Sequence, residues 1–222
     1  MKNIISNIWM EKKMIHKTDL YSIEYDEKSE KLVQTINETL SQNFQRILDF
    51  WGIEKLDNHV NFQIFSEQED WIHFYENMSG MKYQDYVVGC ARGPNIYVLA
   101  YDEYKKTQVH KNDSIEDFQK IMIHEFVHIC QNQLCKDASK LSFIMCEGLA
   151  TYLAGQPYNP DIKIDYPKEK LFSDELFSLS NDLYSMSQKI VRKLVEKVSR
   201  EKLIEYSLDY TKLYEDWERL GM

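Results

Sequence analysis

The strand-like segments of this chain all lie before residue 102, and helical patterns fill the remainder. Apolar stretches typical of strands occupy residues 20–25, 60–65, 86–90 and 96–101, with turn-forming residues at 91–95. After residue 114, apolar residues recur at three- and four-residue steps, which predicts helices over 115–134, 139–154, 174–198 and 200–217. Strands followed by helices predict an α+β fold.

The first half also contains helical patterns. A long amphipathic helix is predicted over residues 29–50, with Gly52 as its stop, and a short helix over 67–78. We therefore expect residues 1–113 to form a small mixed sheet with helices, and residues 114–222 to form a helical portion of the same compact unit. A chain of 222 residues is long enough to bury a substantial core and to form a cleft.

Composition and charge narrow the classes of function. The formal net charge of -9 disfavours a sequence-independent nucleic-acid binder, because such proteins neutralise phosphates with Lys and Arg. No uncharged apolar run approaches the ~20 residues that span a bilayer, so we expect no membrane segment. Residues 1–11 lack the apolar core of a secretory signal, and the four cysteines show no CxxC spacing. We therefore expect a cytoplasmic protein with reduced thiols.

The most informative motif is His124-Glu125-Phe126-Val127-His128, an HExxH sequence on the predicted helix 115–134. Helix positions four residues apart differ by about 40° in direction and ~6 Å along the axis, so both imidazoles can face one metal ion. The pentapeptide also occurs by chance, so a metal site needs a third ligand. The opposite arc of the helix is apolar and predicts a core face, with Phe118, Met122, Phe126 and Ile129.

Glu147 is the candidate third ligand. It lies in the middle of the predicted helix 139–154, which is apolar around nearly its whole circumference and is expected to be buried. An unpaired buried carboxylate costs several kcal/mol, so Glu147 is neutral, pairs with a cation or binds a metal. No Lys or Arg follows Lys140 on this helix, which favours a metal over a salt bridge to a distant Arg. We also expect the small residues Gly148 and Ala150 to let this helix approach the HExxH helix closely.

The spacing of these residues resembles a known family. HExxH, then eighteen residues, then Glu147-Gly148-Leu149-Ala150-Thr151-Tyr152 is similar to the gluzincin peptidases, which include thermolysin-like enzymes, aminopeptidases and small peptidase MA-like proteins. The resemblance covers residues 114–200. It implies a zincin-like fold in which the HExxH helix crosses beneath an N-terminal sheet and a helical C-terminal part closes the cleft.

The resemblance also implies roles for individual residues. His124, His128 and Glu147 would hold one Zn²⁺ per chain, and Glu125 would act as general base toward the attacking water. Two imidazoles and one carboxylate leave a fourth position for water, as in catalytic zinc sites, although cobalt or manganese could substitute for zinc. Tyr184 is similar to a late Tyr that leans over the zinc in small gluzincins, and we predict that it stabilises the oxyanion. Ordinary packing is the alternative in a chain with fifteen tyrosines.

Two further comparisons with the family concern the surroundings of the site. The family presents an edge strand before the HExxH helix, to which the substrate backbone pairs; residues 96–101 occupy that place, with an inner strand as the alternative. Thermolysin-like members have an Asp one turn after the third ligand that orients a ligating His. This chain has Thr151 there, so that support differs or comes from elsewhere. The remaining histidines are predicted to be ordinary surface or core residues: His16, His59, His73 and His110.

The sequence thus favours a zinc metallopeptidase that hydrolyses peptide bonds in peptides or extended protein loops. The main alternative is a non-catalytic zinc protein that uses the same cleft to bind a peptide or partner. Glu125 argues against that alternative, because a structural zinc site needs only ligands. A third reading, a helical scaffold with a coincidental HExxH, predicts no bound metal. We expect a peptide or protein substrate, and neither nucleic acid nor membrane as a partner.

Overall fold

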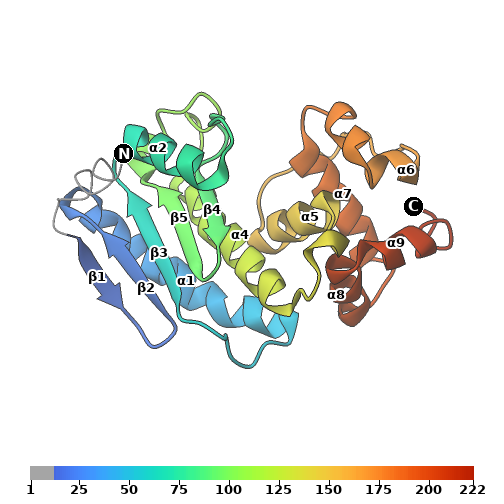
Figure 1. The fold of residues 1–222 in the computed structure, drawn as a ribbon, viewed down its shortest axis with the longest axis horizontal. Coiled ribbons are helices and arrows are strands. Elements are labelled where there is room, and N and C mark those ends of the chain that lie inside the picture. Colours follow the sequence, from blue (N-terminus) through green and yellow to red (C-terminus); the bar gives the residue numbers. More distant parts are fainter. Residues whose placement is uncertain (1–12) are drawn as a thin grey trace. The chain divides into compact units, whose positions relative to one another are not determined.

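The computed structural model describes residues 13–222 (Figure 1). Residues 1–12, which include the stretch without a secretory-signal pattern, lie outside the described residues. The described chain up to Phe44 and Asp57–Glu125 form one compact unit, and Gln45–Leu56 with Phe126–Met222 form a second. Both boundaries fall inside long helices, so α1 (Glu30–Trp51) and α4 (Ile115–Leu134) contribute to both units.

The first unit is built on a five-stranded sheet with the order β1-β2-β3-β5-β4 (Figure 1). β3 pairs in parallel with β2 and β5, whereas β1 and β4 run antiparallel to their neighbours at the two edges. The sheet is therefore mixed, and with the helices it confirms the α+β class. The strands are β1 (Met14–Lys17), β2 (Tyr21–Tyr25), β3 (Val60–Phe65), β4 (Gly89–Arg92) and β5 (Asn95–Leu99).

The edge strand is β4, so the prediction of an edge at residues 96–101 was wrong. β5 lies between β3 and β4 because a tight turn through Gly93, with a φ of 57°, folds β4 back along the outer side of β5. A glycine takes this left-handed conformation without steric cost. The inner-strand alternative is the one that the structure confirms.

The register of β4 decides which backbone groups face the open side of the sheet. The amide of Leu99 donates to the carbonyl of Val88 at 2.9 Å, and Gly89 pairs with Val98 in the next position. Alternate residues of an antiparallel strand turn their N–H and C=O groups toward the partner strand. Gly89 and Ala91 therefore turn theirs away from β5, toward the free edge.

Helix α1 packs its apolar stripe as its sequence predicts. The hydroxyl of Tyr21 on β2 donates to the carbonyl of Asn37, and the Tyr21 ring lies 5.4 Å from the ring of Phe44. Gly52, at φ 66°, ends the helix. α2 (Gln68–Ser79) ends in the same way at Gly80. Of the predicted stripe, Leu32 is only partly buried. The other stripe residues are at most 8% exposed: Val33, Ile36, Leu40, Phe44, Ile47, Leu48 and Trp51.

The second unit is helical, and its centre is the pair formed by α5 (Phe143–Ala154) and α7 (Leu183–Val195). A Cβ on Gly148 would lie 2.6 Å from the backbone oxygen of Ser187 and 2.7 Å from Cγ2 of Val191, both on α7. The prediction that Gly148 admits the HExxH helix was therefore wrong, because its bare face meets α7.

Side-chain caps divide the later helices more finely than the periodicity indicates. Ser142 caps α5, Asp182 caps α7, and Asp209 separates α8 (Arg200–Leu208) from α9 (Tyr210–Asp216) by accepting from the amide of Thr211. Short helices α3 (Tyr101–Tyr104) and α6 (Lys168–Leu171) complete the set, together with 3-10 turns at Glu27–Ser29, Ala138–Lys140 and Asp174–Ser178. Within residues 13–222, no helix has the length and apolar character needed to cross a membrane.

Candidate metal centre

Helix α4 begins at a reciprocal cap and is held in register by its apolar face. The hydroxyl of Ser114 accepts from the amide of Asp117, and the Asp117 carboxylate accepts from the amide of Ser114, which is a capping box. The predicted core residues of α4 are at most 6% exposed: Phe118, Met122, Phe126 and Ile129. Their burial fixes which side of α4 carries His124 and His128.

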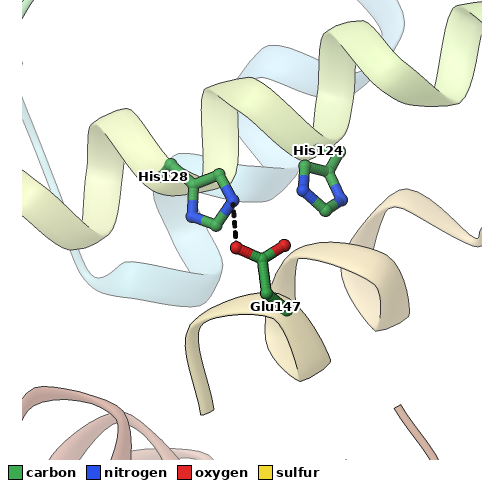
Figure 2. Close-up of side chains that lie close together, drawn as sticks. All are labelled: His124, His128 and Glu147. Carbon is green, nitrogen blue, oxygen red and sulfur yellow. Dashed lines mark ion pairs between the residues drawn. The ribbon is translucent and has the colours of Figure 1, made fainter. Parts of the chain in front are cut away.

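The structure brings the three predicted ligands together. One ligand atom from each of His124, His128 and Glu147 lies within 4.8 Å of the others. Figure 2 shows both imidazoles projecting from α4 toward the carboxylate on α5. His124 and His128 are one helical turn apart on a continuous helix, so the helix itself sets their separation.

The distance between His128 and Glu147 suits a shared ion. Nε2 of His128 lies 3.6 Å from Oε1 of Glu147, beyond the 2.7–3.2 Å of ordinary N–H···O hydrogen bonds. Two donors bound at about 2.0–2.1 Å to one tetrahedral zinc lie ~3.4 Å apart. Two imidazole nitrogens and one carboxylate oxygen are also a donor set that binds divalent metal ions well. The residues therefore fit a metal ion.

The three ligands differ in how far they are exposed to solvent. The side chains of His128 and Glu147 are 17% and 18% exposed, and His124 is 7% exposed. Glu147 lies among fully buried residues of α5, including Met145 and Leu149. The ligands are thus fixed by the core while remaining open to solvent on one side.

Glu125, the predicted base, lies against the edge strand of the first unit. It is 7% exposed, and a Cβ placed on Gly89 of β4 would lie 3.2 Å from its Oε1 and 2.9 Å from Cγ2 of Ile121. The close approach of β4 to Glu125 therefore requires a glycine. The sequence-based interpretation missed this role, although a glycine inside a strand pattern is a signal of close approach.

The thiol of Cys90 lies beside the same carboxylate. Burial, and then the negative charge of Glu125, raise the pKa of Cys90 to about 12. The thiol therefore remains protonated near neutral pH, and it is not a reactive thiolate.

Thr151 does not take the place of the family's orienting Asp. Its hydroxyl donates to the carbonyls of Glu147 (2.7 Å) and Gly148 (3.1 Å) within its own helix, and the residue is 3% exposed. The Thr151 hydroxyl therefore donates to the backbone of α5 and does not orient a ligating histidine.

Tyr184 lies in the first turn of α7. It is 40% exposed, and its ring centroid is 5.8 Å from that of Phe143. Phe143 and Glu147 are four residues apart on α5 and so share one side of that helix. Tyr184 is thus on the ligand side of α5, and its role as oxyanion donor stays a prediction.

The other histidines do not join a metal-binding group in residues 13–222, where the cluster above is the one group of three such ligands. His16 contacts Asn37 at 3.1 Å, and His110 contacts Asp113 at 2.8 Å while stacking on Tyr104. His59 and His73 are exposed.

Comparison with models of known protein families gave no match, and comparison with curated proteins gave none either. The function of the site has to be inferred from its own geometry and chemistry.

Proposed function

We propose that this chain is a zinc-dependent peptidase of the gluzincin type with a zincin-like fold. In this proposal His124, His128 and Glu147 hold the metal and Glu125 is the general base. The observation that carries the proposal is the convergence of three ligand atoms within 4.8 Å, with Glu125 next to one of the ligands in the chain.

The proposed roles follow from the position of each side chain. When bound, zinc would supply a Lewis acid that polarises water and the scissile carbonyl. Glu125 would accept a proton from the attacking water and deliver it to the leaving amine. Its low exposure limits competing hydration, and its contact with β4 restricts the carboxylate to a narrow range of positions. Tyr184 would donate to the oxyanion.

An extended polypeptide is the proposed substrate because β4 offers a free edge. The backbone groups of Gly89 and Ala91 point away from β5, and an added strand would bond to them. Gly89 also approaches Glu125, so a strand paired there would run close to the base. A folded domain cannot pair in this way unless one of its loops extends.

The test is metal content and peptide cleavage of three proteins: wild type, Glu125→Gln and Glu116→Gln. Glu116 is an exposed glutamate in the first turn of the same helix, so it controls for the loss of one charge on α4. Each protein is incubated with a mixed peptide library, with and without a chelator. We expect one zinc per chain in all three, with cleavage by wild type and Glu116→Gln only.

Three outcomes would contradict the proposal. Zinc in every protein without cleavage by any would favour the non-catalytic zinc protein. No stoichiometric metal in wild type would eliminate the site altogether. Cleavage that survives Glu125→Gln would show that another residue is the base.

A further inference from the structure

A hollow lies in the helical unit, and none of the proposed catalytic residues lines it. Its volume is about 450 Å³, within the range of small-molecule sites. It is formed where the ends of α1, α5 and α7 meet the start of α8. The lining residues are Arg46, Phe50, Tyr152, Leu153, Val195, Val198, Arg200 and Leu203.

The hollow has an apolar floor and a cationic rim. Leu153 and Leu203 are buried at its base, whereas Val195 is 37% exposed at its margin. Arg46 and Arg200 are exposed. No Asp or Glu is among the lining residues, although the chain has 36 acidic residues against 27 basic ones.

A third arginine, Arg192, lies against Tyr152 of the lining. Arg192 precedes Val195 by one turn of α7, and its guanidinium lies 5.3 Å from the ring of Tyr152 and 4.5 Å from that of Tyr158. Nε of Arg192 is buried with no hydrogen-bond partner in the described part of the chain. Two tyrosines thus hold this cation in place without neutralising it.

The use of arginine here is selective. The chain has only five arginines: Arg46, Arg92, Arg192, Arg200 and Arg219. Two of them, Arg46 and Arg200, line the hollow, and Arg192 packs on the lining residue Tyr152. The far more numerous lysines of the chain are absent from the lining. Guanidinium groups bind carboxylates through paired, planar hydrogen bonds, which lysine cannot form.

The existing contacts of Arg200 can give way to a ligand. Arg46 donates to the carbonyl of Leu153, and Arg200 donates to the carbonyl of Asp49. Arg200 also pairs with Glu201, but these side chains are 52% and 70% exposed. An exposed ion pair contributes little to stability, so an incoming carboxylate can displace it.

We infer that this hollow binds a monocarboxylate with an apolar body. The body would cover the leucine and valine side chains, and the carboxylate would bond to Arg200 at the rim, with the positive charge of Arg192 behind Tyr152. Two sources offer this chemistry: a free aliphatic acid, and the C-terminal residue of a peptide with an apolar side chain.

The test is calorimetric titration of the full chain with matched pairs of ligands. Each ligand is raised to roughly 1 mM, because a few such contacts are expected to give a Kd of that order. Decanoate is compared with 1-decanol, and N-acetyl-Ala-Leu is compared with its C-terminal amide. We expect at least one acid to bind roughly tenfold or more tightly than its uncharged counterpart. Binding of only one acid identifies the source.

Variants then locate the site. Arg200→Gln should weaken acid binding roughly tenfold, Arg192→Gln should weaken it less, and Val195→Glu at the exposed margin should abolish it. Arg219→Gln, at an exposed arginine outside the lining, is the matched control and should bind as wild type does. Thermal melts establish that each variant is folded. The inference is overturned if neither acid binds, if decanol binds as tightly as decanoate, or if folded Arg200→Gln and Val195→Glu bind normally.

Discussion

Replacement of Gly89 tests the position of Glu125 without removing a metal ligand. Gly89 supplies no ligand, yet its bare Cα faces both Ile121 and Glu125. A methyl group there would have to displace the isoleucine or the carboxylate. Movement of a catalytic group by about 1 Å can reduce turnover roughly a hundredfold.

The proposed function therefore predicts that Gly89→Ala binds zinc as wild type does but loses most of the peptidase activity, by roughly a hundredfold in kcat. Metal analysis and initial rates on one peptide substrate measure the two properties separately. Unchanged kcat in the variant would show that Glu125 does not need the space beside Gly89. Loss of zinc would instead show a wider distortion of α4.

A second substitution identifies which neighbour moves. Ile121→Ala removes the methyl that would lie 2.9 Å from the new Cβ. If the clash with Ile121 pushes Glu125 out of place, the double variant recovers activity over Gly89→Ala. If the new methyl displaces Glu125 directly, stability recovers and activity does not.

At the scale of elements, Gly148 sets the distance between α5 and α7. The groups nearest to its missing Cβ include a backbone oxygen of α7, which cannot rotate away as a side chain can. We predict that Gly148→Ala lowers the free energy of unfolding by ~1–3 kcal/mol, the usual cost of overpacking. Denaturant unfolding measures the change.

The sign of this change is the decisive point. Alanine is favoured over glycine inside an isolated helix by ~1 kcal/mol, so propensity alone predicts stabilisation. A more stable Gly148→Ala protein would contradict the close packing of α5 on α7. Ala150→Gly, two residues further along α5 and on the other side of that helix, gives the expected cost of glycine as a reference.

The junction of α8 and α9 predicts a pH dependence. Asp216 accepts a hydrogen bond from the hydroxyl of Tyr206 at 2.6 Å and pairs with Arg219 at 2.9 Å. These contacts lower the pKa of Asp216 from its ordinary 3.8 to about 2, and the hydrogen bond from Tyr206 has the largest effect. A depressed carboxyl pKa means that the unfolded chain takes up the proton more readily than the folded one.

The stability contributed by Asp216 is therefore present above about pH 4 and is lost as the pH falls toward about 2. Thermal melts between these values should show a decrease in wild type that is smaller in Asp216→Asn. Glu215→Gln, at the exposed neighbouring carboxylate, should retain the wild-type decrease. Equal slopes in wild type and Asp216→Asn would rule out this assignment.

The elements that sequence could predict are those fixed by local patterns. The stripe of α1, the cap and core face of α4, and the four-residue spacing of His124 and His128 all depend on neighbours along one helix. Glu147 was also predictable, because a carboxylate in an apolar helix requires compensation.

The features that sequence missed depend on contacts between distant segments. The sequence around Gly148 does not indicate that this residue faces α7. A small residue predicts a close approach of two segments, but it does not show which segment approaches. The same holds for Gly89 and Glu125. The position of β4 outside β5 depends on the turn at Gly93, and strand patterns alone do not specify which strand becomes the edge.

At the scale of the whole molecule, a bound ion would link helices α4 and α5. His124 and His128 belong to one continuous helix, and Glu147 belongs to α5, which packs on α7. A ligand that binds only the folded chain stabilises it in proportion to the logarithm of its concentration over Kd. Metal binding should therefore appear in global unfolding, without any assay of activity.

We predict that zinc at about 100 times its Kd stabilises the fold by ~2.7 kcal/mol, which raises the Tm by about 5–10 °C for a chain of this size. Chelator should reverse the shift. Glu147→Gln should lose most of it, because the variant lacks the anionic oxygen that joins α5 to the ion, whereas His73→Ala, at an exposed histidine of α2, should keep it. A shift of equal size in Glu147→Gln and wild type would place the ion elsewhere, and no shift in wild type would show that the cluster of His124, His128 and Glu147 is an ordinary polar contact.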